Sequence, residues 1–83
     1  MHYVYILQSK KHGKLYKGSS SDLKERIREH NRGNVISTKS GIPWELIYYE
    51  AFSKKADALR EEKFLKSGKG RERLAYLLKY TLR

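Results

Sequence analysis

The chain contains no cysteine, so neither a disulfide nor a thiolate metal site can support its fold. Its 83 residues suffice for one domain with a thin core. No segment approaches the roughly 20 apolar residues of a membrane span. The apolar run Tyr3–Leu7 is too short for a signal-peptide core, and no basic segment precedes it. We therefore expect a single domain over residues 1–83, located in the cytoplasm and without a membrane partner.

Acidic residues are few relative to basic ones. The chain holds 19 Lys and Arg against 9 Asp and Glu, a net charge of +10. Residues 1–42 carry 9 basic and 3 acidic residues and residues 43–83 carry 10 and 6, so the excess is not confined to a tail. A small basic globule is expected to bind a polyanion, and its affinity for nucleic acid should be sensitive to salt. A ribosome-associated or merely basic protein is the alternative at this point.

Three short segments have the composition of β-strands. Tyr3–Leu7 is β-branched and aromatic, which predicts a central strand buried on both faces. The turn residues Lys10–Gly13 join it to a second strand, Lys14–Gly18, so the two form a hairpin. Trp44–Phe52 predicts a third strand. Because the hairpin makes the sheet antiparallel, we predict an α+β fold in which helices flank a small three-stranded antiparallel sheet.

Three helices complete the predicted order β-β-α-β-α-α. A polar loop is expected between the first helix and Gly41. The last helix is amphipathic and follows a basic stretch. The first helix is expected to begin at the capping residue Asp22 and to end at Asn31, with Gly33 as the stop. The second is expected to be capped by Ser53 and to end at Gly68, and the last to follow the basic stretch Lys66–Arg73.

Two polar side chains lie on the inward side of the first predicted helix. On a helical wheel, Arg26 and His30 share the face of Leu23 and Ile27, whereas the other charged residues point outward. They are also neighbours at i and i+4. One interpretation is an arginine that snorkels at the edge of the core and a satisfied, half-buried histidine. The other is a phosphate clamp, because guanidinium binds phosphate oxygens and imidazole can move a proton near neutral pH.

The second predicted helix has a carboxylate in the same kind of position. Glu62 falls inside the arc bounded by Ala58 and Leu65, whereas Glu61 points to solvent. A half-buried carboxylate is costly unless it is paired or binds a metal. A salt bridge to Arg26 or another cation and a metal site are both consistent with this position.

Three other features have ordinary structural interpretations. Tyr5 and Tyr16 would face each other only if the hairpin turn holds about four residues, and packing is the usual role of a strand tyrosine. Ser19–Ser21 read as a strand-to-helix turn rather than as nucleophiles. Gly68–Arg71 lacks the spacing of a phosphate-binding Walker loop, which argues against a nucleotide site.

The order of these motifs resembles the GIY-YIG nuclease family over nearly the whole chain. Tyr3-Val4-Tyr5 and Tyr16-Lys17-Gly18 match the two name motifs, and Arg26, His30 and Glu62 follow in the family's order. The likeness is greatest to small stand-alone members, which resemble the nuclease module at the N-terminus of the UvrC excision-repair subunit. Further matching segments are Ser21-Asp22-Leu23, Ser37-Thr38-Lys39, Pro43–Leu46, Ala58-Leu59-Arg60 and Leu65–Arg71.

This sequence departs from the family pattern at three places. Tyr3 stands where the first motif has glycine. Lys17 replaces an apolar residue between Tyr16 and Gly18 and is either an edge-strand or a phosphate-facing lysine. Some branches use an asparagine late in the domain, and this chain has none after Asn34.

The resemblance implies a metal-dependent endonuclease that hydrolyses DNA phosphodiester bonds. The substrate would be structured or weakly specific DNA in repair or recombination. Glu62 would hold Mg²⁺ or Mn²⁺, and Tyr5 would accept a proton from the attacking water after nearby cations lower its pKa from about 10. Arg26 would stabilise the phosphate, while Tyr16 and His30 would orient the water or share the proton transfer. The implied catalytic set is Tyr5, Tyr16, Arg26, His30 and Glu62.

Binding to the nucleic acid is expected from basic residues around this set. DNA is the expected partner, RNA is an open alternative, and a targeting protein is compatible with so small a module. The oligomeric state is open. The alternative function is a non-catalytic, basic nucleic-acid-binding module of the same fold. The expected contacts with nucleic acid are Lys17, Lys39, Lys66, Lys69 and Arg71.

Overall fold

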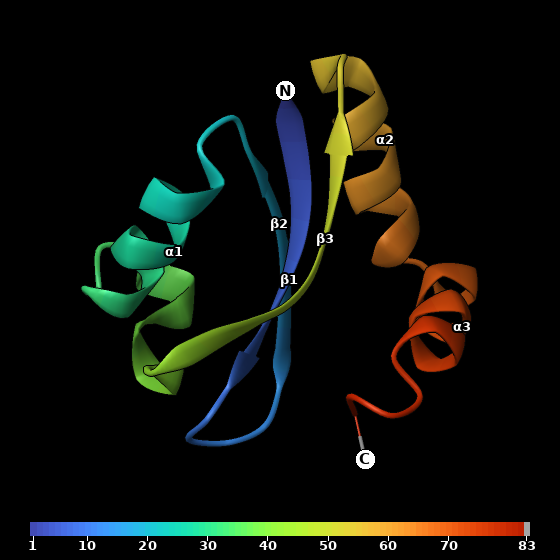
Figure 1. The fold of residues 1–83 in the computed structure, drawn as a ribbon. Coiled ribbons are helices and arrows are strands. Elements are labelled where there is room, and N and C mark those ends of the chain that lie inside the picture. The colour runs from blue at the N-terminus through green and yellow to red at the C-terminus, as the bar shows by residue number, and fades with distance from the viewer. Residues whose placement is uncertain (83) are drawn as a thin grey trace.

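The computed structural model describes residues 1–82 and has the predicted element order. Figure 1 shows a sheet with α1 and the 3-10 helix η1 on one side and α2 and α3 on the other. The α+β fold with a three-stranded antiparallel sheet is therefore confirmed. The elements are β1 (His2–Ser9), β2 (Leu15–Ser20), α1 (Leu23–Asn31), η1 (Ile36–Gly41), β3 (Trp44–Phe52), α2 (Lys55–Leu65) and α3 (Gly68–Leu77).

Strand β1 lies in the middle of the sheet, which has the order β2-β1-β3. Its apolar run is buried because helices cover both of its faces, as the sequence predicted. In the β1–β2 pair, Tyr5 lies opposite Gly18 and Leu7 lies opposite Tyr16. Tyr5 and Tyr16 are therefore diagonal neighbours on one face rather than directly opposed. The connection between the strands contains Gly13, whose φ of +78° suits glycine.

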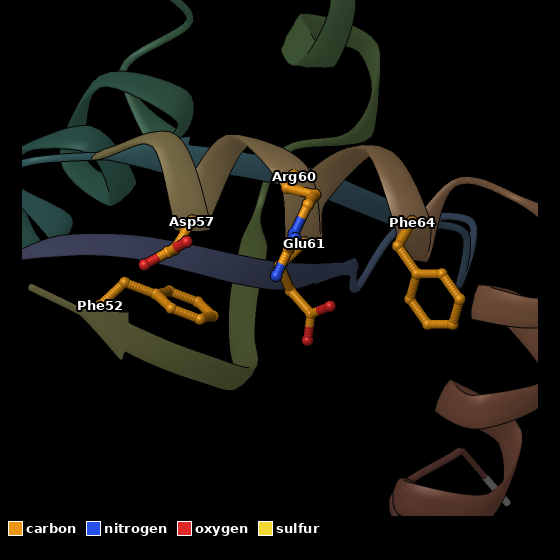
Figure 2. A pocket seen from close by; sticks show the side chains of 5 residues that line it. All are labelled: Phe52, Asp57, Arg60, Glu61 and Phe64. Carbon is orange, nitrogen blue, oxygen red and sulfur yellow. The ribbon is translucent and has the colours of Figure 1, made fainter. Parts of the chain in front are cut away.

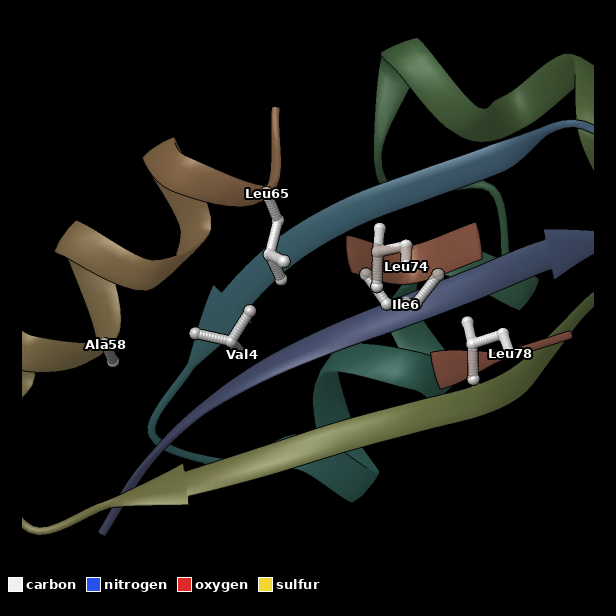
Figure 3. Packing of buried hydrophobic residues seen from close by; sticks show 6 residues of the cluster. All are labelled: Val4, Ile6, Ala58, Leu65, Leu74 and Leu78. Atoms are coloured by element: carbon white, nitrogen blue, oxygen red, sulfur yellow. The ribbon is translucent and has the colours of Figure 1, made fainter. Parts of the chain in front are cut away.

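Side chains of β1 alternate between two small cores. Val4 and Ile6 pack with residues of α2 and α3, and Figure 3 shows this cluster around β1. Tyr5 and Leu7 face the other way and pack with Trp44 on the side of α1. This alternation places the first candidate tyrosine on the α1 side of the sheet.

Helix α1 has the predicted boundaries. The side chain of Asp22 accepts a hydrogen bond from the amide of Glu25 at 3.1 Å, and Gly33 ends the helix with φ of +83°. Asn31, in the last turn, bonds both backbone groups of Trp44, at 2.7 and 3.1 Å. These two bonds fix the C-terminal end of α1 against β3.

The second and third helices begin and end at other places than predicted. Lys54 is at the N-cap of α2 and makes no side-chain capping bond, so the predicted Ser53 cap is wrong. Helix α2 ends before Gly68, which instead begins α3. The basic stretch Lys66–Arg73 thus lies mostly within α3 and does not precede it. The N-cap of α3 is Ser67, a residue within the basic stretch.

The predicted polar loop before β3 contains the helix η1, so that prediction is also wrong. Tertiary contacts hold this segment, which has no apolar periodicity of its own. The indole of Trp44 donates to the carbonyl of Thr38 at 2.7 Å, and the Ser9 hydroxyl donates to the carbonyl of Gly41 at 2.6 Å. As a result Thr38 is buried. Across residues 1–82, each helix is too short or too polar to cross a membrane.

Candidate active site

A chain of buried hydrogen bonds links β1, α1 and η1. The hydroxyl of Tyr5 lies 2.8 Å from Nε2 of His30, and Nδ1 of His30 lies 2.8 Å from the hydroxyl of Thr38. Tyr5 is 1% exposed, and His30 and Thr38 are equally well buried. His30 is therefore a fully enclosed member of a hydrogen-bonded chain, and not a half-buried histidine at the edge of the core.

Tyr16 and Arg26 lie around the Tyr5–His30 pair. The Tyr16 ring centroid lies 4.9 Å from that of His30 and 6.3 Å from that of Tyr5. Arg26 is hydrogen-bonded to Tyr5, which raises the pKa of the guanidinium. It also lies 3.6 Å from a carboxylate oxygen of Glu29, and its side chain is 34% exposed. Arg26 thus lies between the buried tyrosine and solvent.

The pKa shifts define the protonation states of the buried pair. Burial raises the pKa of Tyr5 to about 12, although the hydrogen bond from Arg26 acts to lower it. The predicted lowering of this pKa is therefore wrong for the protein without metal. Burial, together with the charge of Arg26, lowers the pKa of His30 to about 4. At neutral pH Tyr5 is a neutral phenol, and His30 is a neutral imidazole able to accept a proton.

Glu62 is held by two side chains of this chain. The Ser19 hydroxyl donates to Oε1 at 2.7 Å, and Nζ of Lys66 lies 2.9 Å from Oε2. Burial acts to raise the pKa of Glu62, but the hydrogen bonds from Lys66 and Ser19 outweigh it and lower the pKa. The carboxylate is ionised at neutral pH. Its ion-pair partner is Lys66, so the predicted salt bridge to Arg26 or another cation is present, and the cation is Lys66.

The two halves of the site meet at the edge strand β2. Ser19, which binds Glu62, lies opposite Val4 and faces α2, whereas Tyr16 faces α1. Between them is Gly18, where an added Cβ would lie 2.6 Å from the Tyr5 hydroxyl oxygen. Glycine thus allows the Tyr5 hydroxyl to reach this edge. Ser19 belongs to β2 and not to the predicted strand-to-helix turn.

Glu61 does not point freely to solvent, contrary to the helical-wheel prediction. It is half-buried and lines a concavity of about 440 Å³ with Phe52 and Phe64 on another side of α2. Figure 2 shows this pocket, which contains none of the candidate catalytic side chains. A hydrogen bond with Glu50, followed by burial, raises the pKa of Glu61 to about 7. Helical periodicity misplaced this residue because Glu50 approaches from β3.

The structure does not bring all of the predicted nucleic-acid contacts together. Lys17 lies on the α2 side of β2, where the charges of Arg71 and Lys66 act on it. Lys39 lies on η1, with its side chain beside Gly33. Lys69 is exposed in the first turn of α3. The structure therefore brings together three of the five predicted basic residues.

Comparison with known proteins agrees with this arrangement. The model of the GIY-YIG catalytic domain matches residues 1–75. The chain belongs to the GIY-YIG family. It thus carries the catalytic domain of a nuclease family, as the motif order had predicted.

Similar GIY-YIG proteins include members named UPF0213. UPF0213 protein SAG0778 of Streptococcus agalactiae is 36% identical over 76 residues, which cover 90% of this chain and 85% of that protein. UPF0213 protein SSP2268 of Staphylococcus saprophyticus is 40% identical over 67 residues, covering 80% of each chain. The solution NMR structure of UPF0213 protein BH0048 from Bacillus halodurans has a TM-score of 0.56 and 37% identity, covering 92% and 83% of the two chains.

Two functional candidates in this GIY-YIG domain were not selected from the sequence. Thr38 was noted only as part of a matching segment, and its contact with His30 depends on the fold of η1. Ser19 was predicted to be a turn residue, although it lies on β2 and its side chain binds Glu62 of α2. The alternation of β2 was the available signal, because it places Ser19 on the face opposite Tyr16.

Proposed function

We propose that the chain is a divalent-metal-dependent endonuclease that hydrolyses phosphodiester bonds of DNA. The observation that carries the proposal is the buried hydrogen bond of 2.8 Å between Tyr5 and His30, with Arg26 on the same hydroxyl. A neutral phenol in hydrogen-bond contact with a neutral imidazole has the geometry that proton transfer requires. The ionised Glu62 of α2 is hydrogen-bonded to Ser19 of the edge strand β2. It supplies the second requirement of this chemistry, a ligand for a metal ion.

The donor set around Glu62 fits a hard divalent cation. Its oxygens are ionised, and Mg²⁺ is usually held by one or two carboxylates, with waters and phosphate oxygens as the other ligands. Mn²⁺ accepts the same oxygen donors. When bound, the ion would stabilise charge on the phosphate and lower the pKa of a bound water. Ser19 would hold one carboxylate oxygen in place, while Lys66 would have to release the other.

Tyr5 would act as a proton shuttle and not as a preformed phenolate. Its hydroxyl takes a proton from the attacking water while its own proton passes to Nε2 of His30. The raised pKa of Tyr5, about 12, keeps the phenol neutral before the step, and the negative charge of the bound phosphate must raise the pKa of His30 above about 4 for the imidazole to hold the proton. Arg26 stabilises negative charge on the phosphate. Tyr16, half-buried beside His30, orients the water.

The charge of the chain supports a nucleic acid as the substrate, and DNA is the one we propose. A net charge of +10 gives affinity through phosphate contacts, and so small a protein has little surface for reading sequence. Structured or weakly specific DNA in repair or recombination is the substrate class we propose, with targeting by a protein partner. Binding without cleavage is the competing outcome of the test.

The test is a cleavage panel of linear, nicked, flapped and branched DNA with Mg²⁺ or Mn²⁺. We expect the wild type to cut at least one substrate, and Glu62→Gln to abolish cutting while DNA binding survives or becomes tighter. Glu61→Gln is the matched control at pH 8, above the pKa of about 7 of Glu61, because it then removes the same charge from the adjacent residue. In an assay well below the melting temperature of the variant, Glu61→Gln should cut at the wild-type rate.

Two results would count against the proposal. Equal cleavage by the Glu62 and Glu61 variants would remove Glu62 from metal binding. DNA binding by a wild type that cuts nothing in the panel would make the chain a binding module of the same fold.

A further inference from the structure

Lys17 lies in a position that alternation along β2 predicts to be apolar. It is opposite Ile6, on the face that packs against α2. Ser19, on the same face, is two residues further along, which places the two Cα atoms about 6.5–7 Å apart. Lys17 is therefore one strand repeat away from Ser19, the residue that binds the candidate metal ligand Glu62.

The turn between α2 and α3 brings two more cations to this place. The hydroxyl of Ser67 donates to the carbonyl of Phe64 at 2.5 Å and accepts from the amide of Gly70 at 3.1 Å. An added Cβ at Gly70 would lie 1.9 Å from the Phe64 carbonyl oxygen, so glycine is needed for the close approach. A guanidinium nitrogen of Arg71 lies 3.4 Å from the carbonyl oxygen of Lys66, to which it donates. The turn therefore holds Lys66 and Arg71 together.

The charges of these cations act on one another. Burial lowers the pKa of Lys17, and the charges of Arg71 and Lys66 lower it further. Among residues 1–82, Glu62 is the acidic partner of Lys66, and neither Lys17 nor Arg71 forms an ion pair with a carboxylate. Of the three cations, Lys66 alone is paired with a carboxylate. If Glu62 turns to a metal ion, that carboxylate no longer compensates Lys66.

We propose that Lys17, Lys66 and Arg71 form a second phosphate-binding site, which holds the DNA phosphodiester next to the one that is cut. The claim that this site lies beside the reacting phosphate rests on the proposed nuclease function. The ligand class of the site, a phosphodiester, follows from the cluster itself, because guanidinium and ammonium groups without carboxylate partners bind phosphate oxygens. Lys66 would exchange Glu62 for this phosphate when DNA and metal bind together.

The experiment compares Lys17→Met with Lys55→Met. Both remove one positive charge and lie on the α2 side of the sheet, but Lys55 is at the start of α2, about 16 Å along the helix from Lys66. Binding of a short DNA duplex is measured in EDTA over a series of salt concentrations, so that no cleavage occurs and Lys17 and Arg71 are tested while Lys66 stays with Glu62. Lys17→Met should weaken binding about five- to tenfold and reduce the slope of log K against log salt by about 1. Lys55→Met should change affinity by less than about twofold and leave the slope unchanged.

Arg71→Met and the double variant of Lys17 and Arg71 extend the test. Because the two cations serve one phosphate, the double variant should lose less than the product of the two single losses. Lys17→Arg should retain the wild-type slope. Equal losses in Lys17→Met and Lys55→Met would overturn the site, since only net charge would then matter.

The site and the proposed function fail separately. A wild type that cuts DNA, with Lys17→Met and Lys55→Met indistinguishable in binding, retains the nuclease and loses the phosphate site. A wild type that cuts nothing, with selective loss in Lys17→Met, retains the phosphate site and loses the nuclease.

Discussion

The hydroxyl of Tyr5 lies 2.8 Å from Nε2 of His30, and the neighbouring groups favour donation from the hydroxyl to the ring. The Thr38 hydroxyl donates to the carbonyl oxygen of Val35 at 3.3 Å, so it accepts from Nδ1 of His30 at 2.8 Å. The proton of the neutral imidazole is then on Nδ1, which leaves Nε2 as the acceptor for Tyr5. Thr38 therefore orients the ring of His30, and a proton can move from the hydroxyl of Tyr5 to Nε2 of His30.

Thr38→Val tests this direction. Valine removes the acceptor for Nδ1 and leaves a buried donor unsatisfied, so we expect unfolding free energy to fall by about 1–3 kcal/mol. Cleavage should fall by about tenfold to a hundredfold, because His30 can adopt the wrong tautomer. Thr38→Ser keeps the hydroxyl and should cut at close to the wild-type rate. Nitrogen NMR of His30 measures the tautomer directly. An unchanged tautomer and rate in Thr38→Val would show that Thr38 only packs against the ring.

Arg26→Ala should lose cleavage with little loss of stability. The side chain is 34% exposed and its ion pair with Glu29 lies near solvent, where such pairs contribute about 0–1 kcal/mol. Its contact with the Tyr5 hydroxyl places it at the proposed reacting phosphate. Arg28→Ala is the control, because Arg28 pairs with Glu25 on the outer face of the same helix. Cleavage rate and thermal melting are measured on both. Equal rates in the two variants would make Arg26 a structural residue.

Positions that depend on local periodicity could be predicted from the sequence. The inward placement of Arg26 and His30 follows from the repeat of 3.6 residues, and the central position of β1 follows from its apolar run. Asp22 and Gly33 marked the ends of α1 for the same reason, since caps act within one turn.

Positions that depend on contacts between distant segments could not be predicted. Ser19 and Glu62 are 43 residues apart and meet only once β2 and α2 are packed. Thr38 belongs to a segment with no apolar period, and it is buried because Trp44 holds η1. The raised pKa of Glu61 depends on a neighbour in another element, β3, which a wheel of one helix does not include.

Glu61→Gln should stabilise the protein in alkaline solution. In the folded protein the pKa of Glu61 is about 7, above its usual value of 4.5, because it shares a hydrogen bond with Glu50. The buried Oε1 of Glu50 has no partner when both carboxyl groups are ionised. The folded state therefore holds a proton that the unfolded state has lost, and stability falls as pH rises from about 4.5 to about 7.

The variant is compared with Glu72→Gln, which removes an exposed charge from α3. We expect Glu61→Gln to raise the melting temperature relative to wild type at pH 8 and to change it little at pH 4, since the protonated carboxyl resembles the amide. Glu72→Gln should give the same small difference at both pH values. A gain for Glu61→Gln that does not depend on pH would mean that the contact with Glu50 does not titrate in this range.

Gly18→Ala should displace the Tyr5 hydroxyl from His30. The added Cβ would lie 2.6 Å from the hydroxyl oxygen and 2.7 Å from Cζ of Tyr5. A tyrosine side chain often moves aside, but Tyr5 is enclosed and hydrogen-bonded at its tip, so movement breaks the contact with His30. We expect a loss of about 1–3 kcal/mol in unfolding free energy and at least a hundredfold loss of cleavage.

Gly68→Ala is the control for this last substitution, because its added Cβ would meet no atom within 4 Å. It should cut at the wild-type rate and be at least as stable, since alanine favours a helix over glycine. DNA binding in EDTA should be nearly the same in both variants, because neither changes a charge. Wild-type cleavage by a folded Gly18→Ala would show that the reaction does not need the Tyr5–His30 contact, and the shuttle would then have to pass through Tyr16, the other tyrosine beside the histidine ring.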